Sequence, residues 1–114
     1  MKFRVIVALV KPNETDRVVD AAKAAGATGA TIIPARGTGI HEAKTLFGLK
    51  LEAQTDAILF LLDDGLVEGV LSAIYDAGRF KDPGTGIAFV LDVEKTVGLE
   101  SQIAYFEQKP DPPG

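Results

Sequence analysis

The chain has 114 residues, of which 46% are hydrophobic and 25% charged, a size and composition that fit one compact globular domain. A formal net charge of −4 argues against a general nucleic-acid binder, and the absence of cysteine excludes disulfide bonds, zinc–thiolate sites and thiol nucleophiles. The first apolar run, residues 3–10, is too short for a membrane span or a secretory signal. We therefore expect a cytoplasmic protein that is not itself inserted in a membrane.

The first half of the chain predicts a strand, a helix and a second strand. Residues 3–10 are apolar and β-branched up to a Lys-Pro pair, which favours a central strand that ends in a turn. Apolar residues at helical spacing follow, with Asn13 or Thr15 as the predicted N-cap and Gly26 as the stop. Residues 28–34 predict a short strand near a sheet edge, because the stretch ends in proline.

The second half repeats this order of elements. Residues 56–62 form a continuous apolar run that predicts a buried strand. Asp63 and Asp64 can cap the helix that follows, whose apolar stripe extends to about residue 77. Residues 87–93 predict the last strand.

The resulting order, β-α-β followed by β-α-β, predicts an α+β, ferredoxin-like βαββαβ fold over residues 1–98. In that fold, four antiparallel strands lie in the spatial order 4-1-3-2, and both helices cover one face of the sheet. Residues 99–114, which end in a proline-rich stretch, are expected to form a partly disordered C-terminal extension.

A Gly-Thr-Gly-Ile tetrapeptide occurs twice, at residues 37–40 and 84–87. The predicted fold places both copies at the same end of the sheet, on opposite edges and roughly 14 Å apart. Successive glycines can turn backbone N–H groups into an anion-binding concavity. Neither copy has the spacing of a P-loop or a Rossmann loop. Two interpretations therefore stay open: flexible connectors, or two walls of one phosphate or nucleotide site.

Basic residues near both copies favour the second interpretation. They are Arg36, His41, Lys44 and Lys50 around the first copy, and Arg79 and Lys81 before the second. In an acidic protein, cations gathered at one end of the sheet indicate an anionic ligand there. His41, the only histidine, can donate to a phosphate or carboxylate or respond to pH; the alternative is an ordinary solvated loop histidine.

Four stretches of the chain form a pattern: Val10-Lys-Pro12, Gly26-Ala-Thr-Gly-Ala-Thr31, Gly37-x-Gly39 and, most specifically, Gly84-Thr-Gly-Ile-Ala-Phe-Val-Leu-Asp-Val-Glu94. Together they resemble the P-II nitrogen-regulatory signalling family, and the resemblance covers most of the chain. It implies a ferredoxin-like homotrimer that binds an adenine nucleotide (AMP, ADP or ATP) in clefts between subunits. It also implies a surface loop that changes with the ligand and a partner protein that is controlled in this way.

The resemblance further implies which residues form the site. Leu9 and Thr31 match positions at the adenine pocket, residues 37 and 39 match the base of the family's T-loop, and residues 84–86 match its B-loop. With the neighbouring cations and loop residues, the predicted nucleotide-binding set is Leu9, Thr31, Arg36, Gly37, Thr38, Gly39, Ile40, His41, Arg79, Lys81, Gly84, Thr85 and Gly86.

The sequence departs from the family where the phosphates would be held. Ile87 stands in place of the B-loop lysine, and Gly98 and Glu100 stand in place of a pair of arginines. Charge-assisted hydrogen bonds are the strongest contacts to phosphate, so this chain must bind a triphosphate through other contacts than the family does. Either Arg36, Arg79 or Lys81 substitutes for the missing cations, or the ligand carries fewer phosphates.

The loop after the second strand is shorter than the family's T-loop and contains no tyrosine, which excludes control by tyrosine uridylylation there. We expect a regulator without catalytic residues or a metal, because the chain offers no nucleophile–base pair and no paired carboxylates for acid–base catalysis. Its ligand would order residues 40–50, and its unidentified partner could be a membrane transporter. The alternative is a trimeric protein of the divalent-cation-tolerance type, structural or metal-binding, without nucleotide.

Overall fold

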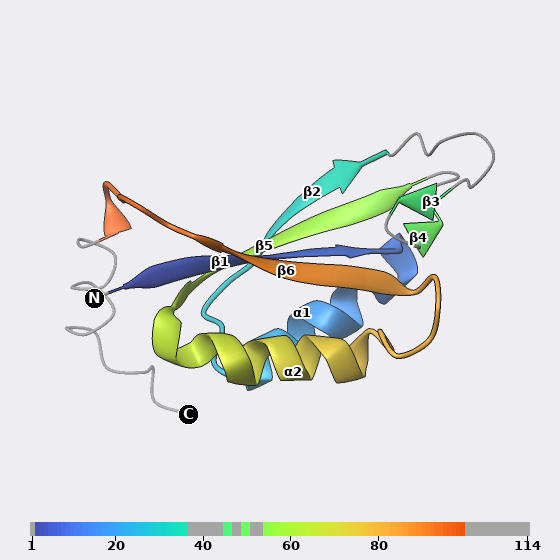
Figure 1. Cartoon of the computed structure of the whole chain (residues 1–114), viewed down its shortest axis with the longest axis horizontal. Helices are drawn as coiled ribbons and strands as arrows, with labels where there is room; N and C mark the ends of the chain where they lie inside the picture. Colours follow the sequence, from blue (N-terminus) through green and yellow to red (C-terminus); the bar gives the residue numbers. More distant parts are fainter. Residues whose placement is uncertain (1, 37–44, 47–48, 51–53, 100–114) are drawn as a thin grey trace, which may run out of the picture.

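The structure, a computed structural model, describes residues 2–36, 45–46, 49–50 and 54–99. One four-stranded sheet and two helices make up most of this part of the chain (Figure 1). The strands of the sheet are β1 (Phe3–Val10), β2 (Thr31–Ala35), β5 (Thr55–Asp63) and β6 (Gly86–Asp92), and a separate two-stranded ribbon consists of β3 (Thr45–Leu46) and β4 (Leu49–Lys50). The helices are α1 (Thr15–Ala24) and α2 (Val67–Ala77), each preceded by a short 3-10 helix, η1 (Pro12–Glu14) and η2 (Asp64–Leu66).

The four strands lie in the order β2-β5-β1-β6, and every neighbouring pair is antiparallel. This is the predicted order, with β6 as the fourth strand and β5 as the third. Both helices lie on the same face of the sheet (Figure 1), so the α+β, ferredoxin-like prediction is confirmed. None of the helices in the described ranges is long and apolar enough to cross a membrane.

Alternate side chains of the two central strands point into the helix layer and form the core. Ile6 of β1 and Ile58 and Phe60 of β5 have no exposed surface, and they cluster with Val18 of α1 and Ile74 of α2. The side-chain period of two in a strand places these residues on one face. We call it the covered face.

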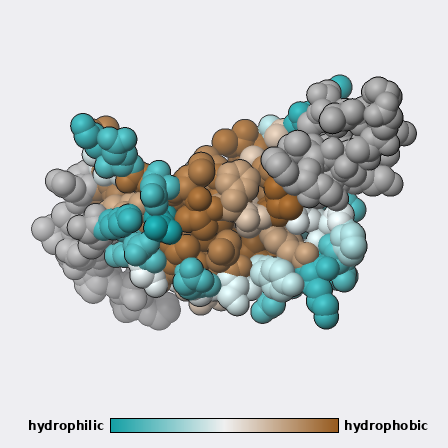
Figure 2. Space-filling view, in the orientation of Figure 1, coloured by the Kyte–Doolittle hydropathy of each residue, from teal (hydrophilic) through white to brown (hydrophobic). Residues whose placement is uncertain are grey.

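The opposite face of the sheet, here called the open face, is also apolar. Cross-strand pairing arranges its residues in three rows, which are Ile33–Ala57–Leu9–Ile87, Thr31–Leu59–Val7–Phe89 and Leu61–Val5–Leu91. Neither α1 nor α2 lies over this face (Figure 1), and several of its large side chains, such as Phe89 at 39% and Leu91 at 49%, are exposed. Figure 2 shows the hydrophobic residues gathered over the middle of the sheet.

The start of α1 differs from the prediction. Neither Asn13 nor Thr15 caps the helix, because Thr15 is its first residue and the N-cap position, Glu14, makes no side-chain capping bond. Instead Pro12 opens η1, in which the Glu14 N–H donates to the Lys11 carbonyl at 2.9 Å. The chain enters the helix from this 3-10 turn, which satisfies a backbone donor that a cap would otherwise serve.

The start of the second helix was predicted in part. The Asp63 carboxylate accepts a hydrogen bond from the Gly65 N–H at 3.0 Å, so it caps η2 and not α2 itself. Among the strands, β1 has the predicted bounds, whereas β2 begins three residues later than predicted. Pairing with β5 sets the ends of β2, and its register starts at Thr31.

Candidate functional site

Four strand ends meet at one end of the sheet, here called the loop end. Ala35 of β2 pairs with Thr55 of β5, and Val10 of β1 pairs with Gly86 of β6. The segment that follows β2 and the segment that precedes β6 therefore begin and finish at the same end, on opposite edges of the sheet. This is the end at which the sequence predicts both glycine runs; the second run, residues 84–87, lies there, and the first is outside the described residues.

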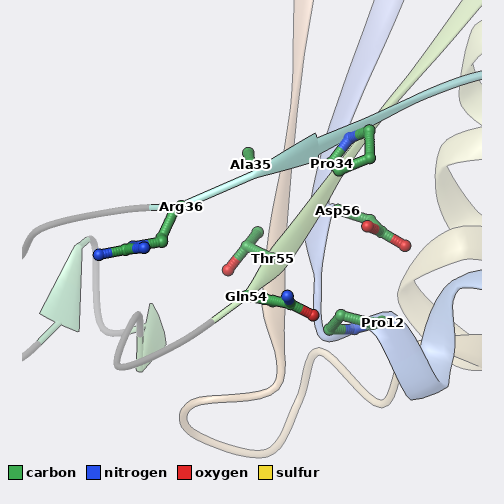
Figure 3. A pocket seen from close by; sticks show the side chains of 7 residues that line it. All are labelled: Pro12, Pro34, Ala35, Arg36, Gln54, Thr55 and Asp56. Atoms are coloured by element: carbon green, nitrogen blue, oxygen red, sulfur yellow. The ribbon is translucent and has the colours of Figure 1, made fainter.

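A pocket of about 440 Å³ lies at the loop end beside β2 and β5. Its lining residues are Pro12, Pro34, Ala35, Arg36, Gln54, Thr55 and Asp56. In Figure 3 the guanidinium of Arg36 extends away from the Asp56 carboxylate, so the two charges do not pair across the pocket. The pocket thus combines a cation, a carboxylate that does not pair with it, and apolar proline walls.

Asp56 ties the pocket to the helix layer. Its carboxylate accepts a hydrogen bond from the Thr15 hydroxyl, at 2.5 Å and across 41 residues of sequence. Thr15 is only 4% exposed, and Asp56 is half-buried. This bond replaces the capping role predicted for Thr15, and it fixes the wall of the pocket against the first turn of α1.

The second glycine run forms a compact loop with α2 and β6. Gly84 has a φ of 77°, a left-handed conformation that disfavours side chains. A Cβ atom on Gly86 would lie 2.8 Å from the Leu9 carbonyl oxygen and 2.8 Å from the Phe80 ring, so β6 can approach β1 here only without a side chain. These two glycines therefore have conformational and packing reasons to be present, whatever the loop binds.

Thr85 closes the same loop. Its hydroxyl lies 2.9 Å from the Arg79 carbonyl oxygen and 3.0 Å from that of Asp82, and its single O–H donates to them. Thr85 is a predicted nucleotide-binding residue, and its described contacts are those of a residue that closes a turn. Arg79 and Lys81, which are predicted site residues, are exposed on this loop.

Leu9 and Thr31 lie on the open face, and so does Ile87. Leu9 pairs directly with Ile87, and Thr31 is the one polar residue in the three rows that define this face. Ile87, which stands where the resemblance implies a B-loop lysine, is therefore an apolar residue beside Leu9 at the loop end of the sheet.

Several predictions fall outside the described residues. They concern Gly37, Thr38, Gly39, Ile40 and His41, the ordering of residues 40–50 by a ligand, and the extension from residue 100 onward. Of the predicted site residues, the structure brings Arg36, Arg79, Lys81 and the 84–86 loop to the loop end, with Leu9 next to them on the open face.

Sequence reasoning missed most of the pocket lining and the role of Phe80. A usable signal was present at Asp56, which is a carboxylate at the start of an otherwise apolar strand. The prolines that line the pocket were treated only as strand ends. Phe80 gave no signal, because its packing against two glycines is a tertiary contact.

Most of the chain matches a known protein family. The family model described as nitrogen regulatory protein P-II matches residues 3–102. This chain belongs to the P-II family. A nitrogen regulatory protein P-II from Mesorhizobium japonicum is 32% identical over 101 residues, which cover 84% of this chain and 90% of that protein. The homologue from Azospirillum brasilense is 31% identical over 101 residues, with the same coverage of 84% and 90%.

A solved structure supports the same assignment. The P-II chain resembles the crystal structure of Arabidopsis thaliana PII bound to citrate with a TM-score of 0.65 and 27% identity, covering 81% of this chain and 78% of that one. The resemblance predicted from the sequence is confirmed, and the family is one of signal-transduction regulators. Within the part of this P-II protein that the structure describes, no group of three or more potential metal ligands lies together.

Proposed function

We propose that this P-II protein is a non-enzymatic regulator that binds an adenine nucleotide at the loop end, between the subunits of a homotrimer, and so controls a partner protein. One observation carries the proposal: the glycine loop at 84–86 and the exposed cations Arg36 and Arg79 lie at one end of a sheet whose second apolar face is not covered by either described helix.

The open face supports the homotrimer. Apart from Thr31 its rows are entirely apolar, and Phe89 and Leu91 remain 39% and 49% exposed in the single chain. Monomeric proteins rarely leave such a contiguous apolar patch in water. Copies of the chain that pack through this face would bury it, and they would bring the loop ends of neighbouring subunits into one assembly.

The charges at the loop end support an anionic ligand. The ion pairs among the described residues involve Arg4 and Arg17, so Arg36, Arg79 and Lys81 take part in none of them. No carboxylate of the described residues therefore competes with phosphate oxygens for their positive charge. The adjacent apolar pair Leu9–Ile87 suits the flat face of an adenine ring.

The same pair favours ligands with few phosphates. Because Ile87 is apolar, β6 contributes no charge at the point where the family has a lysine, and the remaining cations must hold the ligand. We therefore infer that ADP or AMP binds at least as tightly as ATP. We also propose that residues 1–98 form the folded domain and that the protein is cytoplasmic. A transporter is among its candidate partners.

Calorimetric titration of the purified protein with AMP, ADP, ATP and cyclic AMP tests the nucleotide site, and light scattering tests the trimer. Saturable binding with a sub-millimolar Kd is expected for at least one nucleotide. Gly84→Ala should weaken it, because the φ of 77° disfavours a side chain. Gly29→Ala is the matched control, since a Cβ there meets nothing within 4 Å. A monomer, or no binding by any nucleotide, contradicts the proposal.

A further inference from the structure

The helix α2 ends in a common type of turn, but the residue at the left-handed position of that turn is an unusual one. The Phe80 N–H donates to the Tyr75 carbonyl at 3.0 Å, and the Arg79 N–H donates to the Asp76 carbonyl at 3.2 Å. This pair of bonds is the Schellman motif that closes many helices. It places Arg79 in the left-handed region, with a φ of 55°.

Glycine normally occupies this position, because a Cβ atom is strained there. Among the described residues, Arg79 is the only non-glycine residue with a positive φ. A cation near the helix C-terminus does gain from the helix dipole. In α1 the same favourable interaction with the dipole comes from Lys23, which lies in the last turn of the helix and has no left-handed backbone. The dipole therefore does not require an arginine at this strained position, and strained residues of this kind gather at functional sites.

Phe80 and the glycines around it hold Arg79 in place. A Cβ on Gly78 would lie 2.3 Å from the Phe80 ring, and a Cβ on Gly86 would lie 2.8 Å from it, so the ring fills the space that both glycines leave. Phe80 also packs against the core. The Thr85 hydroxyl then binds the carbonyl oxygen of Arg79 at 2.9 Å, which joins Arg79 directly to the glycine run.

We propose that Arg79 is the specificity-determining cation of this loop, which binds a phosphate of the nucleotide, and that Phe80 is its positioning residue. This inference rests on the proposed nucleotide site. Arg79 would then supply the positive charge that the apolar Ile87 does not. Its left-handed backbone is retained because glycine, the residue that suits the turn, carries no charge.

Three single variants separate charge from strain. Arg79→Gln removes the charge and keeps a side chain at the left-handed position, whereas Arg79→Gly removes both the charge and the strain. Lys23→Gln removes a cation from the other helix C-terminus, at the opposite end of the molecule, and serves as the matched control. Calorimetry with ADP and with adenosine, together with thermal unfolding, is measured for each.

Both Arg79 variants should lose about 10- to 100-fold in ADP affinity, since they remove one charged hydrogen-bonding partner. Adenosine affinity should stay unchanged, because adenosine has no phosphate. Arg79→Gly should also raise the Tm by roughly 2 to 5 °C as the strain is relieved. Lys23→Gln should leave both affinities unchanged. An ADP affinity within about twofold of wild type in Arg79→Gln overturns the inference while the nucleotide site stands.

The positioning role has its own readout. Phe80→Leu should weaken ADP binding and spare adenosine, and in the Arg79→Gln background it should cost nothing further, because positioning acts only through Arg79. Additive losses, or an equal loss for adenosine, would assign Phe80 a purely structural role and overturn that part. If the wild type binds neither ligand, the proposed function fails and this inference fails with it.

Discussion

The covered face and the open face of the sheet are built from the same strands and from the same kinds of residue, yet the described helices bury only one of them. Phe60 on the covered face is 0% exposed, whereas Phe89 on the open face is 39% exposed. Strands that are apolar on both faces are typical of sheets buried on both sides. The two described helices cover one side (Figure 1), so the helix layer of the described residues accounts for the burial of the covered face alone, and the proposed homotrimer would supply the second layer.

The largest effect is expected on the covered face. Phe60→Ala should lower the free energy of unfolding by about 3 to 5 kcal/mol, because it leaves a cavity among fully buried side chains. Urea denaturation at fixed protein concentration measures this loss. Tyr75→Ala, which removes an aromatic ring that is 49% exposed on α2, should change stability by less than about 1 kcal/mol. Equal losses in the two variants would show that the covered face is not the main core.

Substitutions on the open face should affect the assembly of the chains more than the folding of each chain. Phe89→Asp places a charge in the surface that copies of the chain are proposed to bury, and burial of an unpaired carboxylate costs several kcal/mol, on the order of 2 to 5. Sedimentation should therefore show single chains at concentrations where the wild type is assembled. Phe89→Leu keeps the surface apolar and should stay assembled. An assembled Phe89→Asp protein with native circular dichroism would mean that the open face is not the interface.

A smaller effect is expected where a polar contact joins the covered face to the helix layer. Thr15→Val removes the hydroxyl that donates to Asp56 and leaves a half-buried carboxylate with one partner fewer. Stability should fall by about 1 to 2 kcal/mol, as measured by urea denaturation. Thr15→Ser retains a hydroxyl and should recover most of the loss. If Val and Ser behave alike, the hydrogen bond does not matter for stability.

The smallest effect is expected at the end opposite the loop end. Arg4 Nε lies 3.0 Å from Asp64 and 3.2 Å from Asp92, but neither contact has hydrogen-bond geometry, and the side chains are 34%, 49% and 69% exposed. Exposed ion pairs contribute little, so Arg4→Gln should cost about 0 to 1 kcal/mol. The cost should shrink further in high salt, which thermal unfolding in two buffers can test. A loss as large as that of Phe60→Ala would break the contrast between the apolar core and its polar rim.

Much of the fold could be predicted from the sequence, because it depends on local patterns. The apolar run at 3–10 and the helical spacing after it determined the first two elements, and the same pattern recurs in the second half. Element ends were less predictable. Thr15 can cap a helix by its chemistry, and only its contact with a strand 41 residues away shows that its hydroxyl is used elsewhere.

The candidate site was predictable to a lesser degree. Glycine and cation positions indicated an anion site at the loop end, because strand order alone brings the two runs to the same end. The pocket lined by Asp56 and the packing of Phe80 between Gly78 and Gly86 were not predictable. The pocket depends on how η1, β2 and β5 meet, and the packing of Phe80 depends on how the end of α2 meets β6. Residue spacing carries no information about either.

By itself, the sequence determined the order of the elements, the apolar character of both faces of the sheet and the family, since each of these is encoded in neighbouring residues. The tertiary structure decided which face the helices cover and why individual residues occupy the loop end. Gly86 is explained by the Leu9 carbonyl of another strand, and the left-handed Arg79 by the hydrogen bonds that close α2. The physical reason is the same in both cases: close approach and backbone strain exist only once distant segments of the chain are packed together.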